Sequence, residues 1–187
     1  MNERKLTMVL VFLANGFEET EAIAPIDILR RNGQKVITVG IGEEIITSSH
    51  GVTVVPDVTE VDIALTSDID MIVLPGGMPG TLNLEKSRTV QDMIDFCVQN
   101  GKFIGAICAA PSILGRKGLL SGRKATCFPG FEEFLEGADF TGAPVEHDGN
   151  IITARGAGVA IEFGLKLVEV LSGKPASDKI RESMRCV

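Results

Sequence analysis

Tryptophan and tyrosine are absent from the chain, and histidine occurs only at His50 and His147 among its 187 residues. With nine phenylalanines as the other aromatic residues, few side chains are available to stack on a flavin or on single-stranded bases. The four cysteines include no Cys-x-x-Cys pair, and two histidines cannot complete a zinc-finger spacing. The composition therefore predicts free thiols and no metal site.

The chain also lacks an excess of basic residues, since Lys and Arg number 18 against 25 Asp and Glu, for a net charge of −7. An acidic chain without a basic stripe argues against binding to nucleic acid or to anionic lipid. It has no run of about 18 apolar residues that would span a membrane. Residues 1–5 carry both signs of charge, and the apolar run that follows meets Asn15-Gly16 too early for a signal peptide. We therefore expect a cytoplasmic protein.

Apolar runs of strand length alternate with helical patterns along the whole chain. This alternation predicts one α/β domain over residues 1–187, with a doubly wound, mainly parallel sheet covered by helices on both faces. Strands are expected at Met8–Ala14, Lys35–Ile41, 71–74 and Phe103–Ile107, with two short strands within 45–55 and a hairpin formed by 145–147 and 151–153. Helices are expected at 18–31, 90–99, 110–114 and 158–171, the last one capped by Gly173.

Ligands of such sheets bind outside the carboxyl ends of the strands, which directs attention to residues 15–21, residues 75–80 and Cys108. Cys108 follows an apolar strand and precedes a helix, with small residues at Ala106 and Ala110. This is the pattern of a nucleophile elbow. A helix N-terminus stabilises a thiolate, so we expect the pKa of Cys108 to fall from about 8.5 toward about 4–7. A buried structural cysteine is the alternative interpretation.

The other two segments offer backbone donors and carboxylates. Gly76 and Gly77 allow close backbone approach to a ligand and would expose N–H groups, although the loop by itself favours a plain tight turn. Glu18, Glu19 and Glu21 begin the first predicted helix, where the helix dipole favours acidic residues. A carboxyl group that faces a thiolate would keep its proton and act as a general acid. His50 and His147 fall in turns and are expected at the surface.

Taken together, six stretches resemble the ThiJ/PfpI superfamily, and within it the DJ-1-like branch. They are spread over nearly the whole chain, which makes the resemblance more specific than any single motif. The stretches are 16–22 (GFEETEA), 74–77 (LPGG), 106–111 (AICAAP), 148–153 (DGNIIT), 155–156 (RG) and 162–163 (EF).

The resemblance implies a flavodoxin-like three-layer α/β/α sandwich, similar to class I glutamine amidotransferases, that forms a homodimer and uses no cofactor. It implies that Cys108 is the nucleophile, that Glu21 hydrogen-bonds to its sulfur, and that Gly77 and Ala109 supply backbone N–H donors. Gly76, Phe128, Arg155 and His50 are expected near the site. The activities implied are a glyoxalase III-type reaction on methylglyoxal or glyoxal and the deglycation of early glycated amino groups.

Three departures from the family pattern affect the expected chemistry. Ala109 stands where the protease/amidase branch has a histidine, which weakens the peptidase hypothesis. Phe128 replaces a histidine that precedes a proline in the animal proteins, and His50 lies near their arginine at the edge of the site. Base-assisted chemistry therefore depends on Glu21. Two alternatives to the enzyme are a redox sensor whose Cys108 oxidises to sulfinate, and a chaperone in which the cysteine is incidental.

Overall fold

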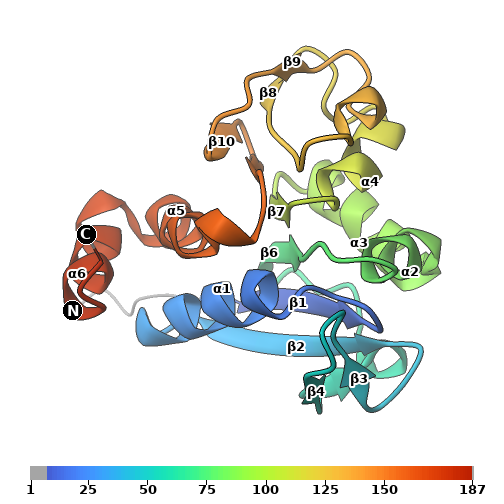
Figure 1. Ribbon diagram of the computed structural model, residues 1–187. Helices are drawn as coiled ribbons and strands as arrows, with labels where there is room; N and C mark the ends of the chain where they lie inside the picture. Colours follow the sequence, from blue (N-terminus) through green and yellow to red (C-terminus); the bar gives the residue numbers. More distant parts are fainter. Residues whose placement is uncertain (1–7, 187) are drawn as a thin grey trace.

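The computed structural model of the protein describes residues 8–186, and a seven-stranded sheet forms its centre (Figure 1). The strands are β1 (Met8–Ala14), β2 (Lys35–Ile41), β3 (Ile46–Thr47), β4 (Thr53–Val54), β5 (Val58–Thr59), β6 (Ile69–Leu74), β7 (Phe103–Ile107), β8 (Lys124–Ala125), β9 (Asp139–Phe140), β10 (Val145–Asp148) and β11 (Ile151–Ala154). The helices are α1 (Glu19–Arg31), α2 (Gly80–Lys86), α3 (Arg88–Gln99), α4 (Pro111–Arg116), α5 (Ala160–Ser172) and α6 (Lys174–Ser183).

The order of strands in this sheet is β10-β11-β7-β6-β1-β2-β5. Every neighbouring pair is parallel except β10 and β11, which form the predicted antiparallel hairpin. Helices cover both faces, so the predicted flavodoxin-like α/β sandwich with a mainly parallel sheet is confirmed. The two predicted short strands after β2 are also present, as the antiparallel pair β3 and β4.

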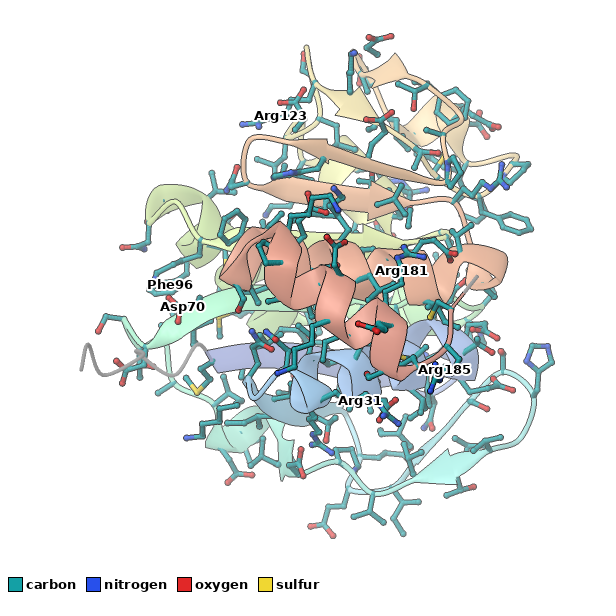
Figure 2. All side chains as sticks on the ribbon, turned by 90° about the vertical axis from the view of Figure 1, so that its left-hand side faces the viewer. Arg31, Asp70, Phe96, Arg123, Arg181 and Arg185 are labelled. Carbon is teal, nitrogen blue, oxygen red and sulfur yellow. The ribbon has the colours of Figure 1, made fainter. Side chains whose placement is uncertain are left out.

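Strand β1 shows why the central strands are apolar throughout. Val9, Val11 and Leu13 pack in the hydrophobic core formed with α1, α5 and α6. Leu10 and Phe12 point to the opposite face and belong to the core formed with α2, α3 and α4. A strand that is buried on both faces needs apolar residues at successive positions rather than at alternate ones. Figure 2 looks onto the first of these layers, with α6 and its labelled Arg181 in front.

Two helices were not predicted. Helix α2 begins at Gly80, directly after the proline-glycine loop, where a poor helix former obscures the pattern. Helix α6 buries only Ser177 and Ile180, so it has almost no apolar stripe to reveal it. Gly173, with φ of 85°, does cap α5 as predicted, but the chain then continues into α6. Among the described residues, no helix is long and apolar enough to cross a membrane.

The strand order places the three segments of interest side by side. Strands β7, β6 and β1 are consecutive neighbours and run parallel, so their carboxyl ends meet at one edge of the sheet. Cys108 follows β7, the Gly76-Gly77 pair follows β6, and the turn that leads into α1 follows β1.

Candidate active site

Cys108 occupies the predicted strand-to-helix turn in a strained conformation. Its φ is 66°, and a non-glycine residue in this left-handed region costs on the order of 1–3 kcal/mol. Two backbone hydrogen bonds hold it there: its N–H donates to the carbonyl of Ala154 (2.8 Å), and its carbonyl accepts from the N–H of Phe128 (2.8 Å). Helix α4 begins three residues later, at Pro111. The surrounding strands therefore fix the backbone that carries the thiol.

The first turn of α1 fixes Glu21. Glu18 caps this helix, because its Oε2 accepts a hydrogen bond from the backbone N–H of Glu21 (2.7 Å). The N–H of Glu18 in turn donates to the carbonyl of Gly76 (2.9 Å). Glu21 is fully buried, which is unusual for a carboxyl group and directs it toward the sheet edge rather than toward solvent.

Gly76 lies between the carboxyl group and the thiol. Its N–H donates to Oε2 of Glu21 at 2.9 Å. A Cβ atom on Gly76 would lie 2.6 Å from Cβ of Cys108 and 2.7 Å from Oε2 of Glu21. Gly77 has φ of 91°, and a side chain there would collide with the backbone of Glu18. Gly76 is therefore required for the close approach of Glu21 and Cys108, and Gly77 for the packing of this loop against the turn that precedes α1.

Burial dominates the ionisation of Glu21. The pKa of this carboxyl group is raised from 4.5 to about 7, mainly by burial and also by the charge of Glu18. The hydrogen bond with Cys108 and the backbone N–H groups of Gly76 and Ala157 act in the opposite direction. Oε1 makes no hydrogen bond of normal length and angle to a described residue, which adds to the cost of ionising the group.

The prediction of a lowered pKa for Cys108 is wrong. The pKa of the thiol is raised from 9.0 to about 12, first by burial and then by the charge and the hydrogen bond of Glu21. Hydrogen bonds from the N–H groups of Ala109 and Gly77 lower it, but with a smaller effect. The helix N-terminus and the two N–H donors could be inferred from the sequence. The position of the buried Glu21 carboxylate beside the sulfur depends on the tertiary fold.

Glu21 and Cys108 form one coupled acid–base pair. Near neutral pH the pair loses its first proton and carries one negative charge. That charge resides on the carboxylate when the sulfur is a thiol, or on the sulfur when Glu21 is protonated and donates a hydrogen bond to it. Because the pKa of the thiol lies above that of Glu21, the carboxylate can accept the thiol proton as the sulfur forms a bond to an electrophile, with no other base needed.

The remaining predicted site residues divide into two groups. Phe128, whose N–H donates to the carbonyl of Cys108, and Arg155 line a cavity of about 410 Å³. His50 is exposed, its Nδ1 lies 3.1 Å from the Glu19 carboxylate, and it is not among the groups that shift the pKa of Cys108. His147 contacts the carbonyl of Gly149 (2.9 Å), away from the sulfur, as expected for a surface residue.

One cluster among the described residues has the donor atoms for a cation. The ligand atoms of Glu18, Glu19 and His50 lie within 4.8 Å of one another. The positive end of α1 opposes a cation at this place, and His50 is solvent-exposed. We assign no metal to the cluster.

Sequence reasoning missed Ala157 and the capping role of Glu18. Ala157 follows β11, which pairs with β7, so the rule on strand ends points to it once the strand order is known. The capping role of Glu18 has a local signal, since an acidic residue three positions before Glu21 opens the helix.

A sequence model of the DJ-1/PfpI family matches residues 7–170. The chain belongs to the DJ-1/PfpI family. The relatives of this DJ-1/PfpI protein confirm its resemblance to the DJ-1-like branch. It is 39% identical to protein dj-1beta of Drosophila melanogaster, with 92% of each chain covered.

A second relative carries an activity in its name: the chain is 32% identical to the glutathione-independent glyoxalase DJR-1.2 of Caenorhabditis elegans, with 87% of each chain covered. Among solved structures, oxidized Toxoplasma gondii DJ-1 superposes with a TM-score of 0.90 at 37% identity, covering 95% of this chain and 97% of that one. The chain spans less than half the length of the Arabidopsis thaliana DJ-1 homologs A (45%) and B (38%), to which it is 39% and 40% identical.

Proposed function

We propose that this DJ-1/PfpI protein is a cysteine-dependent enzyme that converts methylglyoxal-type 2-oxoaldehydes into 2-hydroxy acids. The observation that carries the proposal is the buried Glu21 carboxyl group held beside Cys108 by Gly76. A nucleophile and a base in contact, with two N–H donors at the sulfur, form the arrangement that covalent catalysis on a carbonyl group requires.

The reaction begins as the Cys108 thiol transfers its proton to Glu21 while the sulfur bonds to the aldehyde carbon. The C=O double bond opens, and the oxygen becomes the hydroxyl of a hemithioacetal. The N–H groups of Gly77 and Ala109 lie at the sulfur and can donate to the negative charge that develops on this oxygen. Glu21, with a pKa of about 7, then supplies the proton that the oxygen needs.

The next steps move one hydrogen from the former aldehyde carbon to the neighbouring carbon. Glu21 removes the C–H proton of the hemithioacetal, which gives an enediolate with its charge on the former ketone oxygen. The same group returns a proton to the adjacent carbon, and the hydroxyl proton passes to the former ketone oxygen. The product is a thioester of the 2-hydroxy acid. Water cleaves the C–S bond, which restores the thiol and releases the hydroxy acid, so that one water is consumed and no redox partner is needed.

Early glycated amines are a second substrate class for the same site. In these adducts the aldehyde carbon carries a hydroxyl group and an amine. Displacement of the amine by the Cys108 sulfur, with a proton from Glu21 to the leaving nitrogen, gives the same hemithioacetal. A deglycase and a glyoxalase III-type enzyme therefore differ here only in how the adduct is formed.

The product and its hydrogen content test this mechanism. Proton NMR of methylglyoxal incubated with the wild type is expected to show lactate, with deuterium on carbon two when the solvent is D2O. Glu21→Gln is expected to form a thiol adduct visible by mass spectrometry but to yield no lactate. Lactate at the wild-type rate from Glu21→Gln would rule out Glu21 as the proton carrier.

A redox sensor is the second candidate, supported by the oxidized state of the Toxoplasma gondii relative. Cys108 is partly exposed, whereas Cys97 and Cys127 are buried. With peroxide as the oxidant, the Cys108 thiolate would gain one oxygen as sulfenate and a second as sulfinate. Selective addition of two oxygens at Cys108 under mild peroxide, without aldehyde turnover, would favour the sensor.

Five other expectations from the sequence stay predictions. They are the single domain over residues 1–187, the homodimer, the cytoplasmic location, the chaperone role and the absence of a cofactor.

A further inference from the structure

A cavity of about 410 Å³ lies between the segment that follows β8 and the segment that follows β11. Phe128 and Pro129 line one side of it, and residues 155–159 line the other. Backbone neighbours tie both sides to the site. The N–H of Phe128 donates to the carbonyl of Cys108 (2.8 Å), and the backbone N–H of Ala157 lowers the pKa of the Glu21 carboxyl group. The cavity is therefore lined by neighbours of the Cys108–Glu21 pair, and Cys108 and Glu21 themselves do not line it.

The surface of this cavity is mainly apolar. Phe128 leaves 46% of its surface exposed, and its ring lies against Gly156, where a Cβ atom would be 3.2 Å from Cδ2 of the ring. Val159 and Pro129 add apolar groups. Among the described residues that line the cavity, Arg155 carries the only charge, and its sign disfavours a cationic ligand.

We propose that this cavity binds the substituent R of a substrate R–CO–CHO, and that Phe128 makes the site select branched-alkyl 2-oxoaldehydes over methylglyoxal. The inference rests on the proposed function, because only a substrate bonded to Cys108 is held at this place. The methyl group of methylglyoxal would leave most of the cavity filled with water. A branched alkyl group would displace that water and bury apolar surface against the ring of Phe128.

The expected preference follows from the size of the substituent. Isobutylglyoxal carries three more carbon atoms than methylglyoxal, and each added carbon in an apolar pocket contributes several-fold when it is fully buried. Because Phe128 is only half-buried, we expect kcat/KM to favour isobutylglyoxal by about tenfold, which is less than full burial of the three added carbons would give.

The experiment measures initial rates with freshly dissolved methylglyoxal and isobutylglyoxal, and the readout is the ratio of the two kcat/KM values. The ratio is expected to be about ten for the wild type and to fall to about one in Phe128→Ala. Phe128→Leu, which keeps an apolar group in place, is expected to retain most of the ratio. Phe140→Ala is the matched control, because Phe140 is similarly exposed (42%) but does not line the cavity; it is expected to leave the ratio unchanged.

The outcomes separate this inference from the proposed function. A wild-type ratio near one, or a ratio of about ten that persists in Phe128→Ala, would overturn the inference while methylglyoxal turnover still supports the enzyme. Absence of turnover with both aldehydes would overturn the proposed function and this inference together. If Phe128→Ala does not fold, Phe128→Asn against Phe128→Leu makes the same comparison of polar and apolar groups at this position.

Discussion

Replacement of Glu21 by glutamine is expected to stabilise the protein at alkaline pH and to leave it nearly unchanged in acid. Burial raises the pKa of Glu21 from 4.5 to about 7 in the folded state. The contribution of this group to stability is therefore fully present below pH 4.5, and it is lost as the pH rises through 7. Each tenfold change in the ionisation constant corresponds to about 1.4 kcal/mol, so the loss above pH 7 amounts to about 3 kcal/mol.

Glutamine keeps the size of the side chain and an oxygen that accepts from the Gly76 N–H, but it cannot ionise. We expect the free energy of unfolding of Glu21→Gln to exceed that of the wild type by about 3 kcal/mol at pH 8, with a difference near zero at pH 4.5. Urea unfolding followed by far-ultraviolet circular dichroism is the suitable assay, because the chain has no Trp or Tyr to report by fluorescence. The comparison is repeated in the Cys108→Ala background, which removes the titration of the thiol.

The control is Glu44→Gln, the same chemical change at an exposed position. Its stability difference from the wild type is expected to stay within about 0.5 kcal/mol at both pH values. A Glu21→Gln difference that is equal at pH 4.5 and pH 8 would show that Glu21 is not held with a raised pKa. The reasoning on the coupled pair would then be refuted.

Three further predictions concern the same site. Gly76→Ala would place a Cβ atom 2.6 Å from Cβ of Cys108 and 2.7 Å from Oε2 of Glu21. We therefore expect kcat/KM to fall at least about 100-fold, with an unchanged circular dichroism spectrum. Near-normal activity would contradict the required close approach of Glu21 and Cys108. Cys108→Gly is expected to be more stable than Cys108→Ala by about 1 kcal/mol in urea unfolding, because glycine adopts φ of 66° without strain. Equal stability of the two variants would argue against backbone strain at position 108. Ionised Glu21 is the base, so kcat/KM is expected to rise with pH around 7. Glu18→Gln should move this rise to lower pH, because the charge of Glu18 contributes, after burial, to the raised pKa of Glu21. A pH profile that does not move in Glu18→Gln would contradict the coupling between Glu18 and Glu21.

The central part of the fold was predictable because its signal is local. Strands β1 and β7 coincide with uninterrupted runs of apolar residues and glycine, and β2 with a run that contains only Lys35 and Thr38 as polar residues, as a sheet buried on both faces requires. The two-residue strands β5, β8 and β9 are as short as β3 and β4, but they do not lie within one longer segment with apolar ends, as β3 and β4 do. Helix α6 escaped prediction because it packs through Ser177 and Ile180 only.

The candidate site was predictable in its members but not in its electrostatics. The strand-end rule and the resemblance together identified Cys108, Glu21 and the Gly76-Gly77 pair, and the structure brings them together. The direction of the Cys108 pKa was not predictable from the helix N-terminus, because burial and the neighbouring carboxylate outweigh the two N–H donors. Those two effects depend on how β1, β6 and β7 lie side by side, which no local pattern records.

The rate of methylglyoxal loss in wild type and in Cys108→Ser, with Cys186→Ser as a control thiol, tests the central claim most directly. Cys186 lies near the end of the chain, and it is not part of the Glu21–Cys108 pair. The account predicts steady turnover in the wild type and in Cys186→Ser, and loss of that turnover in Cys108→Ser. Turnover that persists in Cys108→Ser would contradict the assignment of Cys108 as the nucleophile.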